Sequence, residues 1–322
     1  MDSKLPRSVA GRRALAIAAA AFVASIGVLD CGGGSGVTGP SPGGPPPGPP
    51  GGTTTTIPGP TGPATFVGAG DIAMCDALDP ARQTGQLVRN INGTVFALGD
   101  NAYFSGSDHE YRDCYDVAWG SEKFRTRPVL GNHEYEGGNG GAPYFAYYGT
   151  QAGPAGLGYY AFDLGVWRAI ALNSNLAMSD SSPQGQWLRD ELATAHARCT
   201  IAFWHHPLYS SGQNGPQIQT REAYRQLYNA GADVVLTGHD HLYERFGPQD
   251  ADGRLDPQRG MREFIIGTGG ASLYVFNGIS PNSEVRIRAF GVLKLTLDTD
   301  RYDWQFIQVG GQVTDSGSGT CH

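Results

Sequence analysis

Three features that would indicate other classes of protein are missing from this sequence of 322 residues. No lysine- or arginine-rich run occurs after residue 63. With a formal net charge of −7 and 16% charged residues, the chain offers no basic surface for nucleic acid. The five cysteines do not have zinc-knuckle spacing, which argues against a structural metal site. The apolar run at residues 14–29 is too short for a comfortable transmembrane helix. We therefore expect no nucleic-acid partner, and no protein partner is evident.

The N-terminal segment has the layout of an export signal. Basic residues precede an alanine-rich apolar run, which predicts a signal at residues 1–30. The pair Arg12-Arg13 is similar to a twin-arginine signal, so the Sec and twin-arginine routes both stay open. Cys31 follows the apolar run as in a bacterial lipoprotein cleavage site, although Asp30 stands where a small residue is usual. We expect an extracytoplasmic protein, with a lipidated Cys31 attached to the membrane, free secretion and a retained signal anchor as alternatives.

A change of composition separates this segment from the rest of the chain. Residues 31–63 consist almost entirely of glycine, proline, serine and threonine, which cannot bury enough apolar area to fold. We expect a disordered tether here, and a flexible coil of this length spans on the order of 30 Å. Residues 64–322 contain no second linker and no repeat, and they are numerous enough for one sizeable α/β domain.

Four cysteines remain in the predicted domain. An even number in an exported chain indicates disulfides. Of the three pairings that can be drawn, we favour Cys75 with Cys114, which joins two loops, and Cys199 with Cys321, which ties the C-terminus to the start of a strand.

Five short apolar runs are each followed by a polar block. The runs are typical of buried strands and lie at residues 65–67, 94–98, 128–130, 201–203 and 233–237. Four further strands are predicted at residues 167–172, 264–266, 292–297 and 302–307, and helices at residues 80–90, 183–198 and 221–230. The blocks are Gly70-Asp71, Gly99-Asp100-Asn101-Ala102-Tyr103, Gly131-Asn132-His133-Glu134, Trp204-His205-His206-Pro207 and Gly238-His239-Asp240-His241. Open α/β sheets bind ligands where their strands end, so these blocks predict one shared site.

The oxygen-bearing residues of the blocks suit a pair of metal ions. Asp100 can give one carboxylate oxygen to each of two cations and so act as a bridge. Asp71 adds an anionic oxygen, and Asn132 adds a neutral one. A single Gly-Asp or Gly-Asn block is equally typical of an ordinary turn. The blocks taken together, with their histidines, instead predict a two-metal hydrolase.

The remaining candidate ligands narrow the choice of metal. His205, His239 and His241 supply nitrogen ligands that suit zinc, iron or manganese better than calcium. The phenolate of Tyr103 favours a trivalent ion, above all ferric iron. In an extended segment His239 and His241 would lie on one side with Asp240 opposite, and one histidine could serve each metal.

These blocks resemble those of the calcineurin-like metallophosphoesterases, and within them the purple acid phosphatases. The superfamily usually has Asp-x-His in its first block, whereas this chain has Asp71-Ile72-Ala73. Tyr103 stands where purple acid phosphatases place their iron-binding tyrosine. The resemblance covers roughly residues 65–270. It implies a four-layer α/β/β/α sandwich with two mixed β-sheets, and a dimetal site at the carboxyl ends of the strands.

The resemblance also implies two metal sites and roles for nearby residues. The ferric site would consist of Asp71, Asp100, Tyr103 and His241. The divalent site, for Zn, Fe or Mn, would consist of Asp100, Asn132, His205 and His239. His133 matches a histidine that contacts phosphate and assists proton transfer, so Asn132 and His133 are the expected substrate contacts. His206 is a further candidate contact, although we favour a side chain that points away from the site.

One part of the family pattern is missing. Family members usually carry another substrate-contacting histidine about ten residues after the fourth-block ligand, and residues 210–215 contain none. The resemblance implies a metal-dependent phosphoric monoester hydrolase, in which a metal-bound hydroxide attacks a small phosphorylated substrate. The alternatives are a phosphodiesterase or nucleotidase that uses the same two metals, and a surface binding module without catalytic activity.

Overall fold

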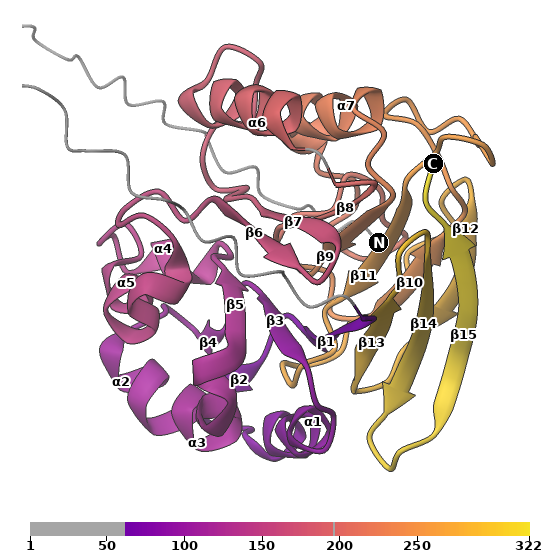
Figure 1. Ribbon diagram of the computed structural model, residues 1–322. Coiled ribbons are helices and arrows are strands. Elements are labelled where there is room, and N and C mark those ends of the chain that lie inside the picture. The colour runs from indigo at the N-terminus through magenta and orange to yellow at the C-terminus, as the bar shows by residue number, and fades with distance from the viewer. Residues whose placement is uncertain (1–61, 196) are drawn as a thin grey trace, which may run out of the picture. The chain divides into compact units, whose positions relative to one another are not determined.

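The computed structural model describes residues 62–195 and 197–322, and Figure 1 shows their arrangement. The predicted export signal at residues 1–30, the candidate lipidation site Cys31 and all but the last two residues of the predicted tether lie outside this range. Among the described residues, no helix has the length and apolar character needed to cross a bilayer.

Two mixed sheets form the centre of the described domain. The first has six strands in the order β15-β14-β13-β1-β3-β5, and the second has seven in the order β12-β10-β11-β9-β8-β7-β6. The first sheet consists of β1 (Ala64–Ala69), β3 (Thr94–Leu98), β5 (Thr126–Val129), β13 (Gly291–Leu297), β14 (Arg301–Gln308) and β15 (Val313–Thr320). The second consists of β6 (Tyr160–Leu164), β7 (Trp167–Ala171), β8 (Cys199–Phe203), β9 (Val234–Thr237), β10 (Tyr243–Phe246), β11 (Arg262–Ile266) and β12 (Ser283–Ile287). A separate two-stranded sheet pairs β2 (Ala73–Met74) with β4 (Ala102–Tyr103). In the chain these short strands follow β1 and β3.

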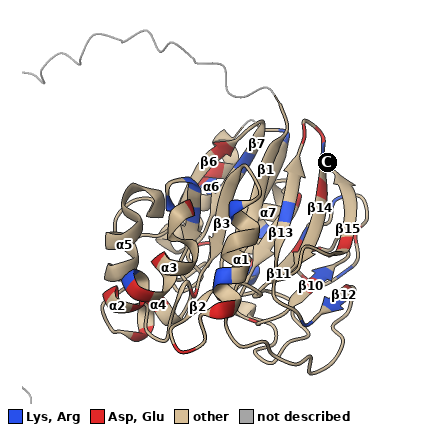
Figure 2. Cartoon of the chain, turned by 90° about the horizontal axis from the view of Figure 1, so that it is seen from below, with Lys and Arg blue, Asp and Glu red and all other residues tan. Residues whose placement is uncertain are grey.

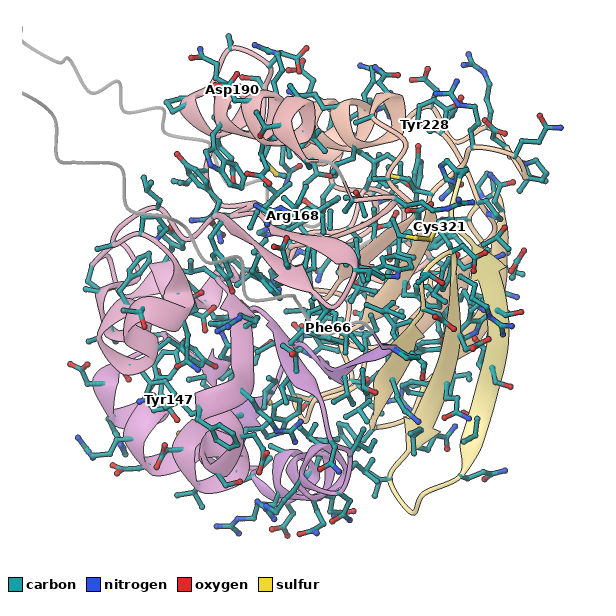
Figure 3. All side chains as sticks on the ribbon, viewed as in Figure 1. Phe66, Tyr147, Arg168, Asp190, Tyr228 and Cys321 are labelled. Atoms are coloured by element: carbon teal, nitrogen blue, oxygen red, sulfur yellow. A yellow bond between two sulfur atoms is a disulfide. The ribbon has the colours of Figure 1, made fainter. Side chains whose placement is uncertain are left out.

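The inner faces of the two sheets pack on each other. Phe66 of β1 is fully buried and makes edge-to-face contacts with Phe96 of the same sheet and Phe203 of the other, at centroid distances of 4.8 and 5.5 Å. Figure 3 shows Phe66 deep between the layers. Such aromatic pairs add about 0.5–1.5 kcal/mol each beyond the area that they bury.

Helices cover the outer faces of the sheets. Figure 1 shows α6 (Pro183–Thr194) and α7 (Arg221–Asn229) side by side over the second sheet, while α1 (Asp79–Arg89) and α3 (Asp116–Trp119) lie by the first. The shorter helical segments are α2 (Asp108–Glu110), η1 (Tyr111–Tyr115), η2 (Gly120–Arg125), α4 (His133–Glu136), α5 (Ala142–Tyr148), η3 (Gly149–Ala152) and η4 (Ile218–Thr220). The predicted four-layer sandwich with two mixed sheets is therefore confirmed.

One helix is shorter than predicted. The hydroxyl of Ser182 accepts a hydrogen bond from the backbone N–H of Gly185, which caps the start of α6 as its sequence indicates. The prediction of a helix over residues 183–198 is wrong at its end, because Ala195 already has extended backbone angles (ψ 128°) and α6 stops at Thr194.

Both favoured disulfides are present. Cys75 pairs with Cys114 across a Cα–Cα distance of 5.2 Å, and Cys199 pairs with Cys321 across 5.4 Å. Cys199 begins β8 of the second sheet and Cys321 follows β15 of the first, so this bond ties the two sheets together (Figure 3).

Charged side chains are spread over the domain. In Figure 2 positive and negative segments are interspersed along the helices and strands seen from this side.

Candidate metal centre

Parallel strands of both sheets deliver the predicted ligands to one place. β1 and β3 run parallel in the first sheet and lead to Asp71 and Asp100, while β8 and β9 run parallel in the second and lead to His205 and His239. The segment after β5, which is parallel to β3, supplies Asn132. The cluster lies at the carboxyl ends of the strands, where open sheets of this kind bind ligands.

The backbone is strained at three of these residues. Asp71, Asp100 and His239 have φ angles of 59°, 48° and 71°, in the left-handed region that non-glycine residues rarely adopt. The only other non-glycine residue with a positive φ in the described part of the chain is Asn282. Strain of about 1–3 kcal/mol per residue persists where the surrounding structure enforces it, and it concentrates at functional sites.

Two glycines allow the ligand segments to approach one another. A Cβ atom at Gly238 would lie 2.6 Å from Oδ2 of Asp71, and one at Gly131 would overlap the carboxylate and the backbone nitrogen of Asp100. Any side chain at either position would therefore force the ligand loops apart.

Four of the predicted ligands form one compact group of donor atoms. The Oη atom of Tyr103 lies 3.0 Å from Oδ1 of Asp71, 3.2 Å from Oδ2 of Asp100 and 3.1 Å from Nε2 of His241. Nε2 of His241 is in turn 3.2 Å from Oδ1 of Asp71. This is the set that the family resemblance assigns to a ferric ion.

The other predicted ligands form a second group that also approaches Asp100. Nε2 of His205 lies 3.3 Å from Oδ2 of Asp100 and 3.2 Å from Oδ1 of Asn132. The ring of His239 is 5.0 Å from that of His205, centroid to centroid. Asp100 thus contacts both groups.

The donor chemistry fits two bound cations. The phenol of Tyr103 has one proton, so it can donate to only one of the three electron-rich atoms around it. Atoms that share a cation at the usual bond length of ~2.0–2.2 Å lie roughly 3 Å from one another, as these do.

Carbonyl groups orient two of the histidines. Nδ1 of His205 lies 2.7 Å from the carbonyl oxygen of Leu98, and Nδ1 of His241 lies 2.8 Å from that of Ser272. A carbonyl can only accept, so Nδ1 carries the proton in both rings, and in the neutral rings Nε2 turns a lone pair toward the cluster.

Burial and neighbouring charges set the protonation of the cluster. Burial by itself raises the pKa of Asp100, but the charges of His205 and His133 and the hydrogen bonds from them hold it well below its usual range. Burial lowers the pKa of His205, yet Asp100 raises it to about 9, so without a metal the ring keeps a proton on Nε2 that a bound cation would displace. The pKa of His239 falls to about 2 because of burial and the positive charge of His205, so His239 is neutral and can offer a lone pair.

The structure corrects two expectations from the sequence. His206 does not point away: it is buried, with its Nδ1 2.8 Å from Oγ of Ser174 and its ring 4.4 Å from that of His239. The last block is not extended, because His239 is left-handed. His239 and His241 nevertheless reach different donor groups, while Asp240 accepts a hydrogen bond from Asn214 N on another loop.

His133 lies at the open side of the cluster. Its Nδ1 is 2.7 Å from the carbonyl oxygen of Phe104 and 3.1 Å from Oε2 of Glu136, and its Nε2 is 3.7 Å from Oδ2 of Asp100. Its side chain is 20% exposed. Since both contacts of Nδ1 are acceptors, that atom carries a proton and Nε2 is left for a ligand.

Sequence reasoning gave no role to two further residues. Glu134 is fully buried and accepts hydrogen bonds from the backbone of Asp100 and Gly131, so it joins two ligand loops. The sequence did contain one signal for Glu134, because it is the fourth residue of the polar block that begins at Gly131. Tyr274 stacks on His241 at a centroid distance of 3.9 Å, and no local pattern indicates this contact.

Comparison with known proteins places the chain in a family. The family model described as calcineurin-like phosphoesterase matches residues 64–243, more than half of the chain. Purple acid phosphatase 22 of Arabidopsis thaliana is 33% identical over 159 residues, which are 46% of this chain and 36% of that protein. Purple acid phosphatase 21 of the same plant is 29% identical over 272 residues, or 76% of this chain and 60% of that protein.

Solved structures share the fold. The purple acid phosphatase PPD1 from yellow lupin (Lupinus luteus) seeds has a TM-score of 0.67 at 22% identity, covering 81% of this chain and 54% of that one. GAP50, described as the anchor in the inner membrane complex of Plasmodium, has a TM-score of 0.59 at 17% identity, covering 81% and 90%. The chain spans between about a third and three fifths of the length of the Arabidopsis relatives given above. The predicted resemblance is confirmed: the chain belongs to the calcineurin-like phosphoesterase family and is purple acid phosphatase-like.

Proposed function

We propose that this protein is a dinuclear-metal phosphatase that hydrolyses phosphomonoesters. The observation that carries the proposal is the position of Asp100. Its Oδ2 atom lies 3.2 Å from Oη of Tyr103 and 3.3 Å from Nε2 of His205, so one carboxylate oxygen is shared by two sets of donors. A carboxylate in this position can bridge two metal ions and hold them close together.

Each donor set suits a different ion. The phenolate of Tyr103 favours Fe(III), which would be held by Asp71, Asp100, Tyr103 and His241. The nitrogen-rich set suits a divalent ion such as Zn, Fe or Mn, which would be held by Asp100, Asn132, His205 and His239. When bound, the two ions supply Lewis-acid neutralisation of phosphoryl charge and lower the pKa of water.

The remaining residues position the substrate and handle protons. The Phe104 carbonyl and the Glu136 carboxylate hold Nδ1 of His133, which aims Nε2 at the open side of the cluster. From there a protonated Nε2 can donate to a phosphoryl oxygen or to the departing ester oxygen. His206 is fixed through Nδ1 by Ser174 and keeps Nε2 available for a second contact from the buried side.

Metal analysis combined with the visible spectrum tests the assignment. We expect two metal ions per chain, with iron among them, and a ferric–phenolate absorption band. Tyr103→Phe should abolish the band, whereas the control Tyr274→Phe should keep it, because Tyr274 stacks on a candidate ligand without being one. A band that survives Tyr103→Phe would refute the iron assignment.

Kinetics test the two-metal scheme and the substrate class. Asn132→Ala and His205→Ala should each lower turnover of an aryl phosphate by orders of magnitude, and wild-type rates in both would overturn the proposal. Comparing an aryl phosphate with its bis-aryl diester separates a monoesterase from a diesterase. A metal-loaded protein that turns over neither would be a binding module.

The location of the protein is part of the proposal. Two disulfides suit an oxidising compartment, which supports an extracytoplasmic protein. If Cys31 is lipidated, the full-length protein should fractionate with membranes and Cys31→Ser should release it. Equal fractionation of both would refute the lipid anchor.

A further inference from the structure

Phe104 is an exposed aromatic residue beside the candidate metal centre. Its side chain is 53% exposed, whereas the preceding Tyr103 is buried. The ring of Phe104 lies 6.0 Å from that of Tyr103 and 6.5 Å from that of His133, and it meets both edge-on. A single exposed apolar side chain is ordinary on a protein surface, and what distinguishes Phe104 is its position beside Tyr103 and His133.

The backbone around Phe104 is held in place. Its carbonyl oxygen accepts a hydrogen bond from Nδ1 of His133 at 2.7 Å. The residues that follow are tied to Glu110, whose Oε2 accepts from the backbone of Ser105 at 3.1 Å and of Ser107 at 2.8 Å. Ser107 and Glu110 form a reciprocal capping box at the start of α2. The segment that carries Phe104 is therefore fixed. The hydrogen bond to His133 comes from the backbone carbonyl of Phe104 and does not depend on its ring.

We propose that Phe104 forms the leaving-group subsite and selects phosphomonoesters whose alcohol carries a flat apolar group. The inference rests on the proposed phosphatase function. A phosphoryl group at the donor cluster, in contact with Nε2 of His133, directs its ester oxygen toward the open side, where Phe104 is exposed and His133 is partly exposed. An apolar ring on that oxygen would stack on Phe104 and remove apolar surface of both from water. A small polar alcohol would gain nothing from this contact.

The neighbouring polar groups do not compete for this role. Residues 210–215 contain no histidine. Within that segment one N–H of the Asn214 side chain is used in a hydrogen bond to the carbonyl of His239. His206 approaches the cluster from the buried side. Phe104 is therefore well placed to contact the organic part of the substrate.

Two alkyl phosphates of similar leaving-group basicity test the proposal, because their chemical reactivity is matched. We would measure kcat/KM for benzyl phosphate and propyl phosphate with the metal-loaded full-length protein, and the inhibition constant of inorganic phosphate. Phe104→Ala should lower the benzyl-to-propyl ratio on the order of 3- to 10-fold. It should leave phosphate inhibition unchanged, because phosphate has no leaving group. Phe104→Trp should retain the preference.

Phe124 provides the matched control. It is 77% exposed in η2, and Phe124→Ala should leave the ratio at its wild-type value. An unchanged ratio in Phe104→Ala, with hydrolysis intact, would overturn the subsite and leave the phosphatase function standing. Failure of the metal-loaded wild-type protein to hydrolyse either ester would overturn the phosphatase function and the subsite together.

Discussion

Replacing Glu134 with glutamine tests how the fold holds the ligand loops together. This buried carboxylate accepts five hydrogen bonds, of which the longest runs from Nδ2 of Asn101 to Oε1 at 3.4 Å. Oε1 accepts from the backbone of Asn101 at 2.8 Å and from the hydroxyl of Tyr111 at 3.0 Å. Oε2 accepts from the backbone of Asp100 at 2.9 Å and of Gly131 at 2.7 Å. A glutamine keeps one oxygen and turns an NH₂ group toward two donors.

The cost of Glu134→Gln follows from those two donors. A buried donor that loses its acceptor costs about 1–3 kcal/mol, so two cost about 2–6 kcal/mol. Part of this cost is recovered, because the ionised form of Glu134 is itself unfavourable in the folded protein. Burial and the charge of Asp100 raise the pKa of Glu134 for that reason. We therefore expect a loss near the lower end, about 2–3 kcal/mol. The bridge Asp100 should also be misplaced, so metal content should fall.

Denaturant unfolding and metal analysis of the purified variant measure both effects. Glu222→Gln is the matched control, because Glu222 accepts one backbone hydrogen bond, from Asp180 at 2.8 Å, at an exposed position. The control should lose less than about 1 kcal/mol and keep its metals. If Glu134→Gln unfolds within about 0.5 kcal/mol of the wild type and binds metal normally, this account of the loops is wrong.

Three further predictions concern other parts of the domain. Gly131→Ala should reduce metal content and destabilise the fold by at least about 1–3 kcal/mol, because the methyl group overlaps Asp100; Gly278→Ala, with open space around it, should do neither. Replacing Cys199 and Cys321 together by serine opens a loop of 122 residues and should cost about 4–5 kcal/mol in denaturant unfolding; stability equal to that of the wild type would contradict this. Burial raises the pKa of Asp233 from 3.8 to about 6, against the hydrogen bonds from the backbone of Thr200 and His322. Asp233 therefore loses its proton at a lower pH in the unfolded chain than in the folded one. The free energy of unfolding should fall by up to about 3 kcal/mol as the pH rises from 4 to 6. Asp233→Asn should flatten that slope, and an unchanged slope would refute the assignment.

Local patterns in the sequence were sufficient for much of the fold and for the candidate ligands. Strand ends could be recognised because apolar runs stop at Gly-Asp and Gly-Asn blocks, as before Asp71 and Asn132. The disulfide pairs followed from an even cysteine count and from the loops that each pair would join. These features depend on residues near each other in the chain, or on the rule that parallel strands end at one edge.

The tertiary structure alone decided which way several side chains point. His206 turns into the site because Ser174, 32 residues away, holds its Nδ1. Glu134 joins two loops through donors up to 34 residues away. His239 adopts a left-handed backbone that no alternation pattern predicts. Periodicity in a sequence records which residues are buried, whereas side-chain direction depends on backbone angles and on partners that only folding brings together.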